Sequence, residues 1–152
     1  MVYRLRPATV ADLEPIVRLL ADDQLGAARD GGFTDDPEPY RRAFAVIDAD
    51  PAHLLLAVLA PDGAVVGTLQ LSFLPGLARR GALRAQLEAV RVAGAHRGGG
   101  LGTAMLTWAV DVARQRGCSL VQLTSDKSRV DAHRWYARLG FVASHDGFKL
   151  RL

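Results

Sequence analysis

The chain has 152 residues, of which 49% are hydrophobic and 23% charged, so it can bury a sizeable core, and we expect one domain over residues 1–152. No apolar run reaches the roughly 20 residues that a membrane-spanning helix needs. Arg4 and Arg6 interrupt any signal-peptide pattern, and the single cysteine, Cys118, excludes a disulfide within the chain. We therefore expect a cytoplasmic protein without a membrane partner.

The net charge of +3 is unevenly distributed. Ten of the sixteen acidic residues lie within 12–50, whereas the sequence from Arg79 onward contains thirteen Lys and Arg and only five acidic residues. The basic residues are dispersed and no aromatic platform accompanies them, so we expect no nucleic-acid partner. A phosphate-rich cofactor held by the second half explains the asymmetry more simply.

The first half of the chain predicts two helices and three strands. Residues 2–6 read as a strand, and Leu13, Ile16, Val17 and Leu20 recur at helical spacing. A loop over 22–38 and a second helix over 38–49 follow. A Pro-Asp-Gly turn then joins two strands, His53–Ala60 and Ala64–Phe73, in a hairpin.

The second half continues with a long strand, Ala82–Ala93, and a helix that ends near Gly117. A buried strand over Ser119–Thr124, a last helix ending at Gly140 and a final strand pair over 141–151 complete the pattern. This order predicts an α/β fold with one mixed sheet flanked by helices.

The run Arg97-Gly98-Gly99-Gly100-Leu101-Gly102 stands between the long strand and the next helix. Glycines there permit positive φ and close approach, and the helix N-terminus offers free amides to a phosphate. No Gly-Lys pair exists for a P-loop, and Thr103 stands where a dinucleotide fingerprint needs its third glycine. The run predicts a pyrophosphate cradle.

The pattern Arg97-x-x-Gly100-x-Gly102 resembles the coenzyme A signature of the GNAT N-acetyltransferase superfamily. Further segments resemble that family in order along the chain: Arg4–Leu13, Glu88–Val92, and Ala132–Phe141 with its Tyr-x-x-Leu-Gly-Phe ending. The resemblance implies a central, mostly antiparallel sheet whose fourth and fifth strands splay apart, flanked by about four helices. It also implies acetyl-CoA as cosubstrate, with direct attack by a primary amine in a ternary complex.

The resemblance also implies the site residues. Backbone groups of Val90 and Val92 would pair with the pantetheine arm, and the loop would hold the pyrophosphate through Arg97, Gly98, Gly99, Gly100, Gly102 and Thr103. The hydroxyl of Tyr136 would contact the cofactor near the thioester sulfur and act as general acid. A tyrosine merely packed on an amphipathic stripe is the alternative.

Glu88 is the candidate general base. Strand alternation places it on the same face as Val90 and Val92, and its apolar neighbours are expected to desolvate the carboxylate partly. A surface residue paired with an arginine of 79–84 remains open, as does a base that acts through water.

Arg129 stands where many family members carry an asparagine seven residues before the tyrosine, in a segment that resembles a branch including aminoalkylphosphonate acetyltransferases. It would contact coenzyme A, or form a salt bridge with Asp126 or Asp131 at the helix entry. His53, His96 and His145 have no metal-ligand spacing, so no metal site is expected.

The acceptor stays open at this point. Acids of the first loop favour a cationic acceptor (Asp22, Asp23, Asp30, Asp35, Asp36), whereas Arg79, Arg80 and Arg84 favour an anionic group. We expect a small-molecule amine, with a protein N-terminus or lysine as alternative acceptors. A non-catalytic acyl-CoA-binding or regulatory domain is the competing function, and a homodimer is left open.

Overall fold

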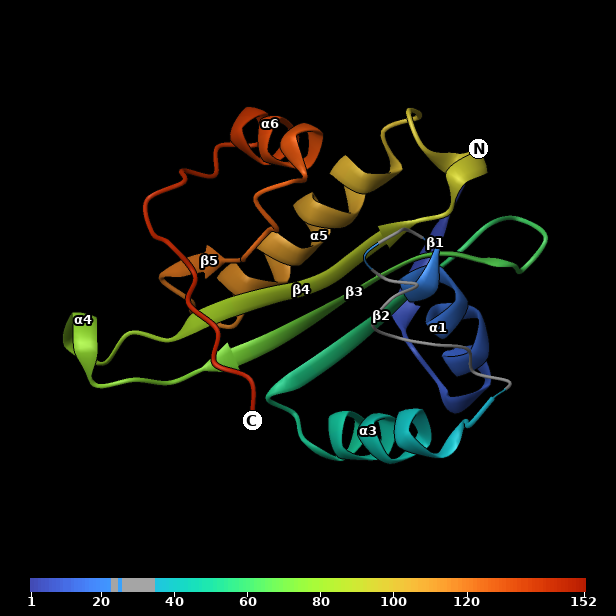
Figure 1. The fold of residues 1–152 in the computed structure, drawn as a ribbon, viewed down its shortest axis with the longest axis horizontal. Coiled ribbons are helices and arrows are strands. Elements are labelled where there is room, and N and C mark those ends of the chain that lie inside the picture. Colours follow the sequence, from blue (N-terminus) through green and yellow to red (C-terminus); the bar gives the residue numbers. More distant parts are fainter. Residues whose placement is uncertain (23–24, 26–34) are drawn as a thin grey trace. The chain divides into compact units, whose positions relative to one another are not determined.

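The structure is a computed structural model that describes residues 1–22, 25 and 35–152 (Figure 1). It divides into two compact units, Met1–Gln122 and Leu123–Leu152. The first unit is built on a five-stranded sheet with the order β1-β2-β3-β4-β5. These strands are β1 (Arg4–Pro7), β2 (His53–Leu59), β3 (Val65–Leu74), β4 (Arg84–Val92) and β5 (Leu120–Gln122).

Neighbouring strands run antiparallel from β1 to β4, and β5 alone runs parallel to its neighbour, β4. The structure thus confirms the expected hairpin (β2 and β3), the expected long strand (β4) and the expected mixed sheet. The described residues of this unit form the helices α1 (Leu13–Ala21), α3 (Glu38–Ala49), the short α4 (Ala78–Gly81) and α5 (Leu101–Gln115). No helix among the described residues is long and apolar enough to cross a membrane.

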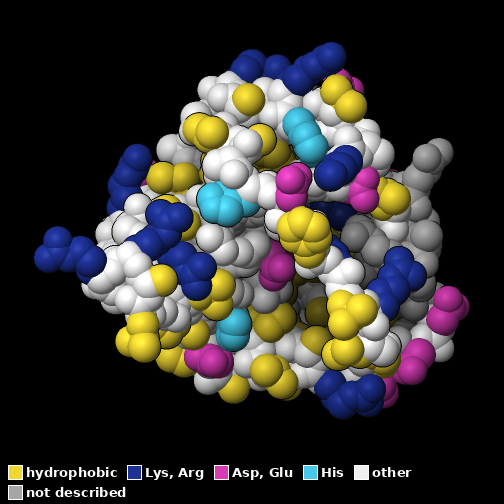
Figure 2. All heavy atoms as spheres, turned by 60° about the vertical axis from the view of Figure 1, so that its left-hand side comes forward, with side chains coloured by type: hydrophobic (Ala, Val, Ile, Leu, Met, Phe, Trp, Pro, Cys, Tyr) yellow, Lys and Arg dark blue, Asp and Glu magenta, His cyan; other side chains and the backbone are white. Residues whose placement is uncertain are grey.

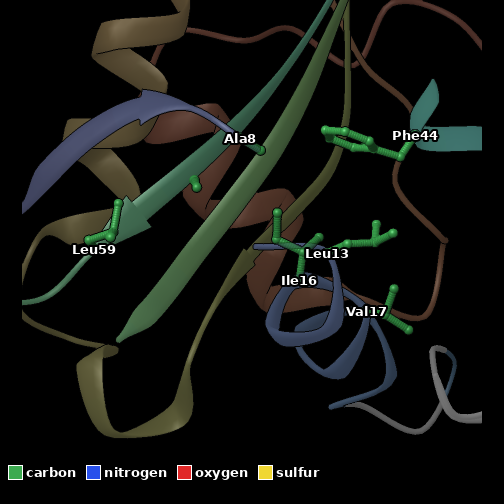
Figure 3. Packing of buried hydrophobic residues seen from close by; sticks show 7 residues of the cluster. Ala8, Leu13, Ile16, Val17, Phe44 and Leu59 are labelled. Carbon is green, nitrogen blue, oxygen red and sulfur yellow. The ribbon is translucent and has the colours of Figure 1, made fainter. Parts of the chain in front are cut away.

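One face of the sheet packs against α1 and α3. Leu13, Ile16 and Val17 come from α1 at helical spacing and gather with Phe44 of α3 (Figure 3). Ala57 and Leu59 of β2 complete this cluster from the sheet, two residues apart as strand alternation requires. This face therefore carries the core that fixes both helices.

The opposite face packs against α5. Met105, Leu106 and Ala109 of that helix are at most 2% exposed, and so are Leu69 and Leu71 of β3. The helix approaches so closely that a Cβ on Gly67 would lie 2.9 Å from Met105 Sδ. Each face of the sheet therefore has its own helical layer (Figure 1).

The second unit holds α6 (Val130–Arg138) and the C-terminal segment. The helix ends at Arg138, and Gly140, just beyond it, has the φ of 91° that suits the expected C-terminal cap. The expected final strand pair is wrong, because residues 141–152 form no strand in the structure. A strand forms only where another strand supplies a hydrogen-bonded ladder, and Phe148 and Leu150 of this segment are exposed.

Candidate functional site

The fourth and fifth strands pair over three residues only. Within the described strands, β5 pairs with Arg84, Ala85 and Gln86 and with nothing beyond, although β4 continues to Val92. The last rung carries a side-chain bond in which Gln122 Nε2 donates to Gln86 Oε1 at 2.8 Å. Beyond Gln86 the outer edge of β4 therefore has no paired residue from β5, and the splay that the resemblance implied stays a prediction.

A β-bulge interrupts β4 just past this point. Gln70 of β3 pairs with Glu88, and Thr68 pairs with Arg91, so Ala89 and Val90 together oppose Leu69. Ala89 has a φ of 53°, in the left-handed region that costs a residue with a side chain roughly 1–2 kcal/mol. Such strain persists where the surroundings fix it and is concentrated at functional sites.

The bulge places Glu88 and Val92 on opposite faces of the sheet. Because directly paired residues share a face, Glu88 lies with Gln70 on the side of α1 and α3. Val92 pairs with Gly67, which contacts α5 on the other side. The expectation that Glu88 shares a face with Val92 is therefore wrong, because the extra residue shifts the alternation. Glu88 is also exposed, contrary to the partial desolvation expected for it.

The two carbonyls expected to pair with pantetheine already accept bonds from guanidinium groups. Arg91 Nη1 donates to the Val90 oxygen at 2.9 Å, and Arg97 Nε donates to the Val92 oxygen at 2.9 Å. A carbonyl oxygen has two lone pairs, so each can accept a further bond. Their role toward a cofactor stays a prediction.

Arg97 fastens the glycine loop to the end of β4. Besides its bond to Val92, its Nη2 lies 3.7 Å from Asp22 Oδ2 at the end of α1. Its side chain is 56% exposed, so the charge that would meet a phosphate is accessible to solvent. An exposed ion pair at this distance is weak, and an incoming phosphate can replace it.

The glycine loop has the geometry that a phosphate cradle needs. Gly98 and Gly100 have φ values of 80° and 84°, which only glycine adopts without strain. A Cβ built on Gly98, Gly99 or Gly100 would meet nothing within 4 Å, so the backbone is open to a ligand. The first helical bond runs from Ala104 N to Gly100 O at 3.0 Å.

The amides of Leu101 and Gly102 consequently have no acceptor inside α5. Such amides and the positive end of the helix dipole favour an anion, and the binding of a phosphate by this turn stays a prediction. Thr103 lies exposed in the same first turn. The structure thus brings Glu88, the bulge and the glycine loop onto one strand and the helix that follows it.

Tyr136 and Arg129 belong to the second unit. The ring of Tyr136 is half-buried and packs on Trp135 and Phe141, with centroid distances of 4.8 and 5.7 Å. Arg129 precedes α6, and its carbonyl accepts the His133 amide at 3.1 Å. Their expected places beside the thioester and the cofactor stay predictions.

The candidate partners of Arg129 have other contacts in the structure. Asp131 lies 3.5 Å from Arg134, and Asp126 Oδ1 accepts the Ser128 amide at 2.9 Å. His133 Nε2 lies 2.9 Å from the Asp126 carbonyl, a bond that holds the helix entry. The histidine therefore has a structural contact at this turn.

Sequence reasoning missed Gln70 and Ala89. Gln70 is one of three polar residues that alternate with apolar ones along β3, with Thr68 and Ser72, and that alternation was the available signal. A bulge at Ala89 had no signal, since no glycine or proline marks it. Asp23 and Asp30 of the first loop lie outside the described residues.

Potential metal-binding side chains do not form a cluster in the part of the chain that the structure describes. Among the described residues, no three His, Cys, Asp or Glu side chains come close enough to hold a metal ion. On the face shown in Figure 2, Lys and Arg side chains are scattered among apolar, acidic and histidine side chains. The absence of a metal stays a prediction.

Comparisons with known proteins agree with this geometry. Residues 14–141 match the model of the acetyltransferase (GNAT) family. The aminoalkylphosphonate N-acetyltransferase of Salmonella typhimurium is 31% identical over 148 residues, which cover 97% of this chain and 90% of that protein.

Two solved structures are also similar to the chain. A protein of Bacillus halodurans described as a transcriptional regulator has a TM-score of 0.95 and 43% identity, covering 99% of this chain and 100% of that one. A putative acetyltransferase of Agrobacterium tumefaciens has a TM-score of 0.84 and 28% identity, covering 98% and 99%. The chain belongs to the GNAT acetyltransferase family and is an acetyl-CoA-dependent N-acetyltransferase.

Proposed function

We propose that the chain transfers the acetyl group of acetyl-CoA directly to the primary amine of a small molecule within a ternary complex. The observation that carries the proposal is the continuity of β4 with the glycine loop. One strand leads from Glu88 through the strained bulge at Ala89 to the predicted anion site at the start of α5. The phosphates would be anchored there, so a thioester would lie along the outer edge of β4.

The bulge sets the side from which the amine arrives. Glu88 lies on the face of α1 and α3, so an amine that gives its proton to this carboxylate approaches from that face. Glu88 is exposed, which suits proton transfer through a water as well as direct transfer. A backbone N–H at the bulge would polarise the thioester carbonyl.

The chemistry needs two proton transfers. Acetyl-CoA supplies the acetyl group already activated as a thioester. As the amine nitrogen bonds to the carbonyl carbon, Glu88 takes the proton that the nitrogen loses. When the carbon–sulfur bond breaks, Tyr136 donates its phenolic proton to the thiolate.

Release of coenzyme A thiol from acetyl-CoA, measured with a panel of primary amines, tests the proposal. Glu88→Gln and Tyr136→Phe should each lower kcat by roughly 100-fold, the lower range for a positioned acid or base. Glu14→Gln is the matched control, because Glu14 is an exposed carboxylate on α1 paired with Arg18. A peptide with a free N-terminus and a lysine belongs in the panel and tests the protein acceptors.

Two results would contradict the mechanism. Full turnover in Tyr136→Phe would remove the general acid, and full turnover in Glu88→Gln would remove the base. Tight binding of acetyl-CoA without turnover on any amine, unchanged in Tyr136→Phe, would favour a non-catalytic acyl-CoA-binding domain.

A further inference from the structure

A pocket of about 250 Å³ lies between the sheet and its α1 and α3 layer. Four residues from three strands form its floor: Leu55, Thr68, Gln70 and Ala89. Side chains of both helices form its walls, among them Ile16, Leu20, Phe44 and Ile47. The pocket therefore lies on the same face of the sheet as Glu88.

The lining is chemically apolar. None of the described residues that line it carries a charge. The Thr68 hydroxyl is 1% exposed and donates to the Leu56 carbonyl at 2.8 Å, so it is already engaged. Gln70 and Tyr40 supply the other polar groups. A charged ligand group would lose its hydration here without gaining a counter-ion from these residues.

The pocket adjoins the proposed point of attack. Ala89, the bulge residue, forms part of its floor and is bonded directly to Glu88. Gln70 forms another part and pairs with Glu88 across the strands, where Cβ atoms lie roughly 4.5–5.5 Å apart. Glu88 therefore adjoins the pocket through its neighbour in sequence and its partner across the strands.

We infer that this pocket holds an apolar group of the acceptor, so that the preferred substrate is a primary amine joined by a short linker to an aromatic ring or branched alkyl group. The inference rests on the proposed function. A cavity of about 150 Å³ lined by Leu, Ile and Phe accommodates benzene. The larger pocket here has room for such a ring together with a linker of one or two carbons.

This acceptor differs from the one named for the Salmonella relative. An aminoalkylphosphonate would place an anion where the phenyl ring of an arylalkylamine would lie. 2-Phenylethylamine and 2-aminoethylphosphonate share a two-carbon linker and differ in the terminal group. They therefore form a matched pair of probes, and ethylamine is the probe that lacks a terminal group.

Ala43 offers a way to fill the pocket without touching the reacting groups. It lines the pocket from α3, and its own side chain is exposed, so Ala43→Phe can project into the space. Ala45, two residues on, is exposed on the same helix and outside the lining, so Ala45→Phe is the matched control. Thermal unfolding of both variants checks that each is folded.

The assay compares kcat/KM for thiol release. We expect 2-phenylethylamine to exceed 2-aminoethylphosphonate by roughly tenfold or more, as burial of a ring predicts. Ala43→Phe should lower the phenylethylamine value roughly tenfold, mainly through KM, and change the ethylamine value less than about twofold. Ala45→Phe should change neither. A preference for the phosphonate, or equal phenylethylamine values in both variants, would overturn the inference.

Direct binding separates this inference from the proposed function. Saturation-transfer NMR should detect 2-phenylethylamine on the wild-type protein with coenzyme A present, and Ala43→Phe should abolish the signal. If no amine is acetylated but this difference is observed, the catalytic proposal fails and the pocket assignment stands. If the wild type shows no signal, or both proteins show the same signal, the pocket assignment fails.

Discussion

Replacing Asp12 by Asn should destabilise the fold more than any exposed ion-pair variant. Asp12 is 5% exposed and receives two bonds from one guanidinium, Arg6 Nη1 at 2.6 Å and Arg6 Nη2 at 2.9 Å. The Thr9 amide donates to the same carboxylate at 2.7 Å. This carboxylate joins β1 to the start of α1, the helix that forms one wall of the pocket.

The magnitude follows from these contacts. Hydrogen bonds to a charged group contribute roughly 1.5–3 kcal/mol, and breaking a fully buried pair costs roughly 3–5 kcal/mol. The Arg6 side chain is 30% exposed, so water compensates part of the loss in the variant. We expect Asp12→Asn to lower the free energy of unfolding by about 2–3 kcal/mol, or the Tm by roughly 5–10 °C.

The effect should depend on pH in a definite direction. The bonds from Arg6, followed by those from Thr9, hold the pKa of Asp12 below its ordinary value of 3.8. A lowered native pKa means that the unfolded chain binds more protons, so this stabilisation is complete above about pH 4 to 5. It is lost as pH falls through the lowered native pKa. The wild type and Asp12→Asn should therefore converge in stability below pH 4.

Urea unfolding at several pH values measures both effects. Glu14→Gln is the control, because the Glu14–Arg18 pair is exposed and such pairs contribute roughly 0–1 kcal/mol. The reasoning fails if Asp12→Asn loses no more stability than Glu14→Gln at pH 7. It also fails if the gap between wild type and Asp12→Asn widens as the solution is acidified.

Three further variants probe the loop, the α5 contact and the cysteine. Gly100→Ala should raise the KM for acetyl-CoA, because an alanine strains the loop that would hold the phosphates. Gly63→Ala is the control: at a φ of 88° the alanine is similarly strained, and the protein should lose about 1 kcal/mol of stability with the KM unchanged. Equal KM values for the two variants would contradict the phosphate cradle. Gly67→Ala should lower the free energy of unfolding by about 1–3 kcal/mol in urea, because the new Cβ would lie 2.9 Å from Met105 Sδ. Unchanged stability would show that α5 moves to accommodate the methyl group. Burial raises the pKa of Cys118, so iodoacetamide should alkylate it more slowly than free cysteine at pH 8. Cys118→Ser should keep full turnover. Loss of activity in Cys118→Ser would indicate a catalytic thiol.

Much of the fold was predictable because its signals are local. Helical spacing in α1 and the Pro-Asp-Gly turn of the hairpin depend on residues that are neighbours in sequence, and the structure confirms both. The glycine loop was readable for the same reason, since positive φ at Gly98 and Gly100 requires glycine. The strand pair over 141–151 failed because pairing depends on a partner that alternation does not identify.

The sequence also could not predict that Glu88 and Val92 lie on opposite faces of the sheet, and this difference bears directly on the candidate site. Alternation assigns faces by counting, so one inserted residue reverses every assignment beyond it. No glycine marks the bulge, because Ala89 itself adopts the left-handed conformation at a φ of 53°. That departure leaves Glu88 with Gln70 on the side of α1 and α3 while Val92 lies on the other side, and Ala89 itself forms part of the pocket floor. In the proposed mechanism, the amine would therefore approach Glu88 from the α1 and α3 side, where it would meet the apolar surface of the pocket.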